Sequence, residues 1–238
     1  TRAPFRISFF GGGTDYKEWF QNNGGSFLSM AINKYCYINC KNFLPFFSYK
    51  NRIVWSKIEK VSEISEITHP AIRAALQKEL VDEVEIQHVG DLPARSGLGS
   101  SSSFSVGLLH ALKAFKGQAL TKKQLALDAI ELERNLLKEP GGIQDQIVAS
   151  YGGLNYVKIL ANGDFTVSKI DLDIEKKREF EESLLLVFTG IFRSSFDVAA
   201  SQIDNMSKNI KELEKISKLT IEARNIFQKD SFINDLGK

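Results

Sequence analysis

The chain has 238 residues, which is enough for one large domain or two small ones. Its hydrophobic content of 43% and charged content of 25% are typical of a globular protein. A formal net charge of +2 gives no reason to expect a nucleic-acid partner, and no apolar run approaches the 18 residues of a membrane span.

Strand and helix patterns alternate in the first half of the chain. Strand patterns cover residues 4–10, 26–33, 35–41, 50–57 and 84–89, and helix patterns cover residues 17–20 and 70–80. Thr14 or Asp15 is expected to cap the first of these helices, because both side chains accept hydrogen bonds from backbone N–H groups. The three glycines at 11–13 indicate a turn with positive φ, or a backbone that another group approaches closely.

A loop rich in glycine and serine, residues 93–107, leads from the strand at 84–89 into a helix. It begins Pro93-Ala-Arg-Ser-Gly-Leu-Gly-Ser-Ser-Ser-Ser103, and apolar residues recur at helical spacing from Phe104 onwards. The N-terminus of a helix attracts anions through its unpaired N–H groups and its dipole, and Gly97 and Gly99 allow a phosphate to come close. The loop therefore predicts phosphate binding.

The loop matches simple helix capping and two well-known nucleotide-binding motifs less well. Serines before a helix often serve only as N-caps, but one serine is enough for a cap and here four follow two glycines. The sequence holds no Gly-x-x-x-x-Gly-Lys-Ser/Thr motif, so the loop is not a P-loop. Ser102 stands where a Rossmann fingerprint needs its third glycine, and no strand ending in an acid follows about 20 residues later.

The second half of the chain continues with helices, a hairpin and one further strand. A helix pattern over 121–137 carries the pair Glu133-Arg134 and is broken by Pro-Gly-Gly at 140–142. Another helix begins near residue 143 with Asp145 in its first turn, where the helix dipole favours a carboxylate. A hairpin over 154–159 and 165–170, a buried strand over 183–189 and a helical stretch over 194–228 follow.

The cysteines and histidines show no metal-site spacing. Cys36 and Cys40 lie on one face of a predicted strand but too far apart along it for an easy disulfide, so we expect buried free thiols. Free thiols suit a reducing compartment, and we expect a cytoplasmic protein. His69, His88 and His110 have no ligand spacing, so no structural zinc is expected.

Three separate segments resemble motifs of the GHMP kinase superfamily, which includes galactokinase, homoserine kinase, mevalonate kinase and phosphomevalonate kinase. Residues 93–103 are similar to the second motif, Pro-x-x-x-Gly-Leu-Gly-Ser-Ser-Ala. Residues 3–16, Ala-Pro-Phe-Arg-Ile-Ser-Phe-Phe-Gly-Gly-Gly-Thr-Asp-Tyr, resemble the first motif, and Gly142-Ile-Gln-Asp-Gln146 resembles the stretch that holds the catalytic aspartate. The Phe-Phe-Gly-Gly-Gly-Thr-Asp-Tyr form is closest to the branch of D-glycero-D-manno-heptose 7-phosphate kinase and fucose kinase.

This resemblance implies an α+β, GHMP kinase-like fold of two domains. We expect a GHMP kinase N-terminal domain, similar to domain 2 of ribosomal protein S5, over residues 1–170, with the ATP-binding motif at 93–107. A C-terminal ferredoxin-like domain would be present only in part, over residues 171–238. The family's third motif, a glycine-rich stretch near the C-terminus, does not occur in this sequence.

The resemblance also implies an ATP-dependent sugar kinase that uses Mg²⁺, with roles carried over by position. Asp145 would accept the proton of the attacking sugar hydroxyl, and Arg6 would orient that hydroxyl and stabilise developing charge. Ser101 and Glu133 would hold Mg²⁺, a hard cation that prefers oxygen ligands. ATP would be bound by Arg95, Ser96, Gly97, Leu98, Gly99, Ser100, Ser101 and Ser102. The sugar would be bound by Gly11, Gly12, Gly13, Thr14, Asp15 and Arg193.

The favoured substrate is D-glycero-D-manno-heptose 7-phosphate, phosphorylated at its anomeric hydroxyl in nucleotide-activated heptose synthesis. Galactokinases have Glu-His where this chain has Gly12-Gly13, and the loss of that carboxylate makes room for a longer or phosphorylated sugar. Arg193 is a candidate for the substrate's phosphate, and a plain surface arginine is an equal alternative.

Two further functions stay open. One is a kinase of fucose or another small alcohol, and the second is a non-catalytic sugar and ATP sensor of the same fold. A sensor could lose catalytic residues freely, so the presence of Asp145, Glu133, Ser101 and Arg6 speaks against it. The expected partners are ATP and a sugar or sugar phosphate, without nucleic acid or membrane, and a homodimer is left open.

Overall fold

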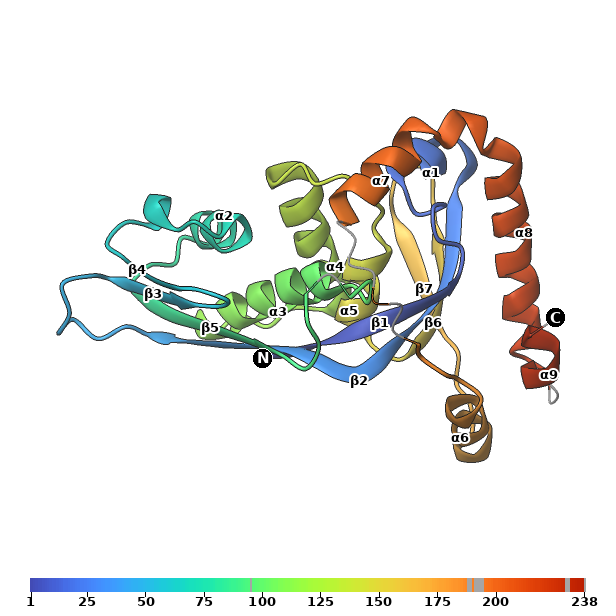
Figure 1. The fold of residues 1–238 in the computed structure, drawn as a ribbon, viewed down its shortest axis with the longest axis horizontal. Coiled ribbons are helices and arrows are strands. Elements are labelled where there is room, and N and C mark those ends of the chain that lie inside the picture. Colours follow the sequence, from blue (N-terminus) through green and yellow to red (C-terminus); the bar gives the residue numbers. More distant parts are fainter. Residues whose placement is uncertain (95, 188–189, 191–194, 230–231, 238) are drawn as a thin grey trace. The chain divides into compact units, whose positions relative to one another are not determined.

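The computed structural model describes residues 1–94, 96–187, 190, 195–229 and 232–237. These residues form two compact units: Thr1–Arg6 with Ala31–Gly152, and Ile7–Met30 with Gly153–Lys238. Two strands, β1 (Arg2–Phe10) and β2 (Gly25–Asn42), contribute residues to both units (Figure 1). The division into domains near residue 170 stays a prediction.

The first unit contains a four-strand part of the sheet in the order β4 (Ile58–Val61), β3 (Asn51–Val54), β5 (Val84–Gly90) and β2. β3 and β5 are parallel, with Ile53 opposite Ile86, whereas β5 and β2 are antiparallel, with His88 opposite Ile38. The strand predicted over 50–57 is wrong in extent, because the chain turns at 55–57 and returns as β4.

The two strands predicted over 26–33 and 35–41 are one continuous strand, β2. Its first part, Gly25 to Met30, pairs with β6 (Leu154–Ile159), and its last part, Cys36 to Asn42, pairs with β5. The polar residues near 33–34 mark the place where β2 changes neighbours rather than a turn, which is why the sequence pattern is interrupted there.

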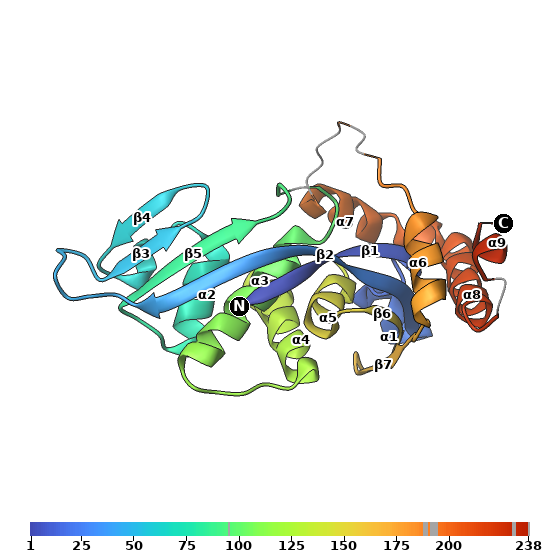
Figure 2. The same ribbon diagram turned by 90° about the horizontal axis from the view of Figure 1, so that it is seen from below.

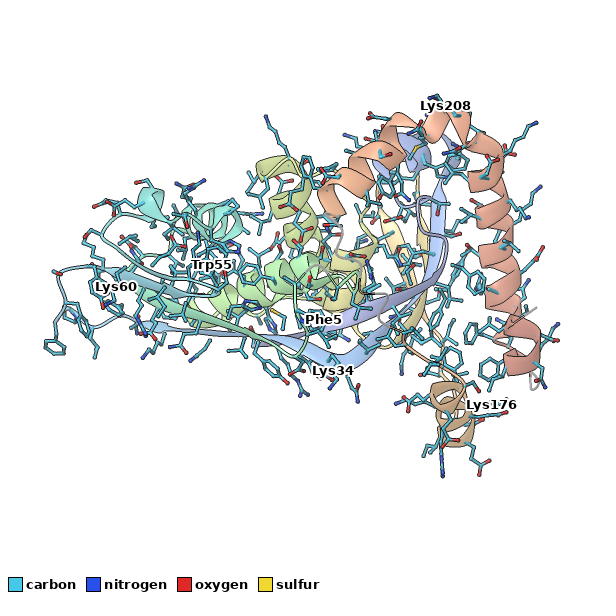
Figure 3. The ribbon with its side chains drawn as sticks, in the orientation of Figure 1. Phe5, Lys34, Trp55, Lys60, Lys176 and Lys208 are labelled. Atoms are coloured by element: carbon cyan, nitrogen blue, oxygen red, sulfur yellow. The ribbon has the colours of Figure 1, made fainter. Side chains whose placement is uncertain are left out.

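Helices α2 (Pro70–Glu79) and α3 (Ser100–Phe115) lie on one face of this part of the sheet (Figures 1 and 2). α4 (Lys122–Ile130) and α5 (Gln144–Tyr151) pack against α3, and the short 3₁₀ helix η1 (Ile64–Glu66) precedes α2. The core between helices and strands contains fully buried aliphatic side chains of α2, α3 and β5, together with Phe5 of β1 (Figure 3). Burial of such side chains is the main source of stability in this unit.

The helix predicted over 121–137 is α4 followed by a π-helix, η2 (Glu131–Leu136). Its start is confirmed, since the Thr121 side chain accepts a hydrogen bond from the N–H of Gln124. The wider π-helical turn is shown by the N–H of Leu137, which bonds the carbonyl of Leu132 five residues earlier. This segment carries Glu133.

The second unit contains the first part of β2 with β6 and β7 (Phe165–Lys169), and the predicted hairpin with its turn at 162–164 is confirmed. An aromatic core formed by Phe180, Phe227 and Phe232 packs near Phe9. The helices of this unit are α1 (Lys17–Asn23), α6 (Ile174–Glu182), α7 (Ser195–Asp204), η3 (Met206–Lys208), α8 (Ile210–Ile226) and α9 (Phe232–Leu236).

Three local predictions for this unit are corrected. Tyr16, not Thr14 or Asp15, is the N-cap of α1, because the Asp15 side chain accepts from Gly13 in the preceding loop and the Thr14 hydroxyl bonds carbonyls of that loop and of β2. The helical stretch divides into α7 and α8 at 205–209, where the carbonyl of Ser201 accepts both the backbone N–H and the side-chain amide of Asn205 at the end of α7.

The third correction concerns the buried strand predicted over 183–189. Residues 184–187 are exposed and have no regular structure, and residues 188–189 lie outside the described residues. An apolar run becomes a strand only when a neighbouring strand pairs with its backbone, and in the described chain none does so here. Within the described ranges, no helix is both long and apolar enough to cross a membrane.

Candidate active site

The predicted phosphate loop ends at the first residue of helix α3, Ser100. Gly97 and Gly99 adopt positive φ values of 77° and 74°, a backbone conformation that favours glycine. Gly99 is the N-cap and has no side chain to accept hydrogen bonds from the first turn, so no capping side chain occupies the backbone N–H groups of that turn. The backbone N–H of Arg6 donates to the carbonyl of Leu98 at 3.0 Å and ties the loop to β1. Arg95 lies outside the described residues.

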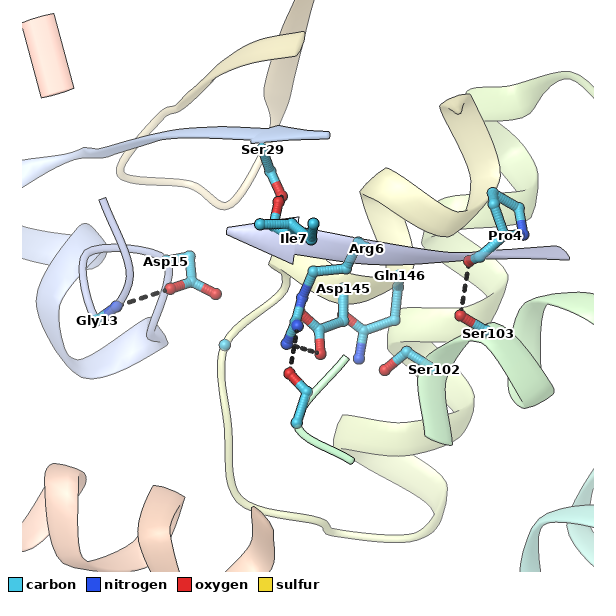
Figure 4. A network of polar contacts seen from close by, with 12 residues as sticks. Pro4, Arg6, Ile7, Gly13, Asp15, Ser29, Ser102, Ser103, Asp145 and Gln146 are labelled. Atoms are coloured by element: carbon cyan, nitrogen blue, oxygen red, sulfur yellow. Dashed lines mark hydrogen bonds and ion pairs between the residues drawn. The ribbon is translucent and has the colours of Figure 1, made fainter. Parts of the chain in front are cut away.

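Arg6 and Asp145 meet in a bidentate ion pair (Figure 4). Arg6 Nε lies 2.6 Å from Asp145 Oδ1, and Arg6 Nη2 lies 2.7 Å from Asp145 Oδ2. The third guanidinium nitrogen, Nη1, donates to the carbonyl of Gly97 at 2.7 Å. A planar guanidinium can hold both partners at once, so one side chain from β1 connects the first turn of α5 to the phosphate loop.

Gly99 is packed directly against this ion pair. A Cβ atom at this position would lie 3.1 Å from Arg6 Cγ and 3.3 Å from Asp145 Oδ2. The glycine is therefore required both for the left-handed backbone and for the close approach of the loop to the two charged side chains.

Glu133 is buried beside the start of α3. Its Oε2 accepts hydrogen bonds from Ser102 Oγ at 2.9 Å, from the side-chain amide of Gln146 and from Arg134 Nη2 at 3.3 Å. Burial raises the pKa of Glu133, and the charge of Arg134 acts in the opposite direction. Its second oxygen, Oε1, has no hydrogen-bond partner among the described residues, and the same holds for Gln146 Oε1.

Ser101 was predicted to bind Mg²⁺ together with Glu133, but a different serine contacts Glu133 in the structure. Ser102, not Ser101, contacts Glu133, while Ser101 is exposed on the first turn of α3. Ser101 as a metal ligand thus stays a prediction. Ser103 donates its hydroxyl to the carbonyl of Pro4 and joins α3 to β1 (Figure 4).

In the second unit, the predicted substrate residues form a tight loop after β1. Gly11 has a φ of 91°, and a Cβ there would lie 2.1 Å from the carbonyl oxygen of Ser26, so only glycine fits. The buried Thr14 hydroxyl lies 2.8 Å from the carbonyls of both Gly11 and Ser26. Asp15 is also buried, and its Oδ1 accepts from the N–H of Gly13 at 3.1 Å (Figure 4).

Gly12 differs from its neighbours in this loop. It is exposed, and a Cβ at this position would meet nothing within 4 Å. The position that carries glutamate in galactokinases is therefore free of contacts in this unit. Arg193, the predicted phosphate contact, lies outside the described residues.

The sequence did not predict which three polar side chains contact Glu133. They belong to Arg134, Gln146 and Ser102. Gln146 was visible as the last residue of the Gly-Ile-Gln-Asp-Gln segment, and Arg134 as the neighbour of Glu133. Neither had a spacing that pointed to its contacts, because the contacts depend on the π-helical turn of η2.

Comparison with known proteins gives one family match, over residues 65–153, to the GHMP kinases N terminal domain. D-glycero-alpha-D-manno-heptose 7-phosphate kinase of Campylobacter jejuni is 26% identical over 83% of this chain and 61% of that protein. L-fucokinase/L-fucose-1-P guanylyltransferase of Bacteroides fragilis is 26% identical over 98% of this chain and 28% of that protein.

Among solved structures, a D-glycero-D-manno-heptose 1-phosphate kinase from Bacteroides thetaiotaomicron superposes with a TM-score of 0.79 at 26% identity, over 95% of this chain and 72% of that one. The expected α+β, GHMP kinase-like fold is confirmed. The chain spans 61% of the length of the heptose kinase and 28% of the length of the fucokinase.

Proposed function

We propose that this chain, whose residues 65–153 match a GHMP kinase N-terminal domain, is part of an ATP-dependent sugar kinase. The observation that carries the proposal is the Arg6–Asp145 ion pair next to the phosphate loop. A carboxylate held beside an anion-binding helix N-terminus is suited to phosphoryl transfer, which needs mainly positioning and charge stabilisation.

In this mechanism Asp145 accepts the proton of the sugar hydroxyl. The hydroxyl oxygen attacks the γ-phosphorus of ATP, the bond from that phosphorus to the β-bridging oxygen breaks, and ADP leaves. Both Asp145 oxygens already accept from Arg6, but each carboxylate oxygen has a second lone pair for the incoming proton. Arg6 fixes the orientation of the carboxylate, while the N–H groups from Gly97 to Ser102 bind the phosphates.

The buried polar atoms near Glu133 fit the Mg²⁺ ion that such a kinase uses. Glu133 Oε1 and Gln146 Oε1 are buried acceptors without a donor among the described residues, and a hard cation prefers oxygen ligands of this kind. Glu133 would hold the ion, with the Ser101 hydroxyl as a second ligand by resemblance. The ion would supply positive charge against the phosphate oxygens.

The proposed substrate is a heptose 7-phosphate, phosphorylated at the anomeric hydroxyl. It is supported by the names of two relatives, a heptose 7-phosphate kinase and a heptose 1-phosphate kinase, and by the open space at Gly12. Fucose is the second candidate, because the fucokinase relative aligns with 98% of the chain. Asp15 and its neighbours in the glycine loop would bind the sugar hydroxyls in either case. The cytoplasmic location and the homodimer stay predictions.

The test is a coupled ADP-release assay of the full-length protein against a panel of sugars and sugar phosphates. A heptose 7-phosphate should give the highest kcat/KM, and Asp145→Asn should lower kcat by roughly 10²-fold or more while ATP binding is retained. A preference for fucose would replace the proposed substrate. Turnover in Asp145→Asn equal to that of the wild type would refute the role of Asp145.

A further inference from the structure

We infer that Arg134 is a positioning residue that fixes α5, and with it Asp145, relative to Glu133; this inference rests on the proposed function. The side chain is 19% exposed and makes four hydrogen bonds. Nε donates to the carbonyl of Gly142 at 3.1 Å, and Nη1 donates to those of Glu139 at 2.9 Å and Pro140 at 3.1 Å. Nη2 lies 3.3 Å from Glu133 Oε2.

The π-helical turn of η2 creates this arrangement. Its wider ring lets the N–H of Glu139 bond the carbonyl of Glu133 at 2.9 Å, six residues earlier, so the chain after η2 folds back over the turn that carries Arg134. Three carbonyls of the segment 139–142 consequently converge on one guanidinium group. We call residues 138–142 the return loop.

The return loop contains two residues with positive φ and packs closely on Arg134. Lys138 has a φ of 53°, which is uncommon for a residue with a side chain, and Gly141 has a φ of 144°. A Cβ at Gly141 would lie 3.1 Å from both Nη1 and Nη2 of Arg134. The loop is therefore packed closely on the guanidinium plane, and lysine, with one compact ammonium group, cannot reproduce three donors in this geometry.

The return loop leads directly into α5. Gly142 precedes Ile143, the N-cap of α5, and Asp145 lies in the first turn. Gln146, one residue further, donates its side-chain amide back to Glu133 Oε2, the same oxygen that Arg134 contacts. Arg134 and Gln146 thus connect α5 to Glu133 from two directions, while Arg6 holds Asp145 from β1. Arg134 itself donates to the return loop and Glu133 and does not contact Asp145 in any described interaction.

If Arg134 positions α5, its removal should affect turnover in a way that general destabilisation of the fold would not. Removing a group that orients a reacting or ligating residue typically costs 10–100-fold in activity, so Arg134→Ala should lower kcat by about that factor, with KM for ATP little changed. Added methylguanidine, which can occupy the space of the lost guanidinium, should restore part of kcat, whereas ammonium should not. Arg134→Lys, which keeps the charge, should remain impaired.

The matched control is Arg73→Ala. Arg73 is also an arginine of the first unit that donates to a backbone carbonyl, that of Ile67 at 2.7 Å, but this hydrogen bond involves neither the return loop nor α5. Its substitution should leave kcat unchanged and should not respond to methylguanidine. Equal losses of kcat in Arg73→Ala and Arg134→Ala, or no rescue of Arg134→Ala, would overturn the inference.

A second measurement does not depend on activity. Hydrogen exchange should become faster in Arg134→Ala over residues 138–150 and return towards the wild-type rate with methylguanidine, while exchange in α2 and α3 stays unchanged. Faster exchange throughout the first unit would show general destabilisation and overturn the inference. If the wild type transfers phosphate to no sugar, the proposed function fails, and the exchange data still decide whether Arg134 holds α5.

Discussion

Replacing Gly99 by alanine tests the geometry of the Arg6–Asp145 ion pair most directly. The substitution has two separable costs. A side chain at a φ of 74° costs about 1–2 kcal/mol of stability through backbone strain. In addition, the new Cβ would lie 3.1 Å from Arg6 Cγ and 3.3 Å from Asp145 Oδ2, closer than ordinary contact, so the pair has to shift by a few tenths of an ångström.

The expected effect on turnover follows from that shift. A misplacement of about 1 Å at a reacting group costs roughly 10²-fold, so a shift of about 0.3 Å should lower kcat by roughly 4-fold. The matched control is Gly117→Ala, at a φ of 70° after α3, where a Cβ meets nothing within 4 Å. It should lose similar stability and keep its kcat.

Both variants are compared by urea unfolding and by the ADP-release assay on the full-length protein. Backbone strain should lower the free energy of unfolding of both variants. Displacement of the Arg6–Asp145 pair should lower kcat in Gly99→Ala alone. Wild-type turnover in Gly99→Ala would refute the claim that the loop packs against the reacting pair. An equal loss of kcat in the two variants would show that backbone strain, not displacement, is responsible.

Three further predictions concern the metal, the substrate and a buried thiol. Glu133→Gln and Ser101→Ala should each raise the Mg²⁺ concentration needed for half-maximal rate, because the first replaces the proposed carboxylate ligand by a neutral amide and the second removes the proposed hydroxyl ligand. An unchanged Mg²⁺ dependence in both would place the ion elsewhere. Gly12→Glu should lower kcat/KM for a heptose 7-phosphate much more than for the unphosphorylated sugar, because the new carboxylate would repel the phosphate of the substrate. Two like charges about 4 Å apart repel by on the order of 4 kcal/mol at an effective dielectric near 20. Equal losses for the two sugars would exclude this charge effect. Burial raises the pKa of Cys36 from 9.0 to about 12, so the unfolded chain loses its thiol proton first. Stability from this group is complete below pH 9 and declines from pH 9 towards pH 12. Urea unfolding should show a larger loss in the wild type than in Cys36→Ala, where only Cys40, with a pKa raised to about 11, still contributes; equal losses would exclude a contribution from Cys36.

The sequence predicted the parts of the site that depend on local backbone chemistry. The start of a helix directly after Gly99 follows from the glycine and serine content of the loop and from the helical spacing of the apolar residues after it. The family resemblance placed Arg6 and Asp145 at the same sugar hydroxyl, but their ion pair was not predicted, because no local rule joins residues that are 139 positions apart.

What the sequence could not predict depends on helix phase and strand pairing. Which of four consecutive serines faces Glu133 is set by the start of α3 and by the π-helical turn of η2, and this selected Ser102. The apolar residues at 184–187 matched a buried strand, yet a strand also needs a partner, and that information is not local. β2 was divided in two because its change of neighbour resembles a turn in the sequence.

Arg6 and Asp145 are in contact but lie far apart in the sequence, and this has a consequence for the order in which the site forms during synthesis. β1 is made before α5, and the carboxylate that its arginine holds is made 139 residues later. Contacts of such long range form late in folding, because closing the intervening chain costs entropy that local contacts do not. A ribosome-bound chain can already form β1, β2 and the helix after the phosphate loop while it still lacks Asp145, the proposed base. Phosphate-binding capacity should therefore arise in nascent chains before turnover does, and no nascent chain that ends before residue 145 can contain the complete ion pair.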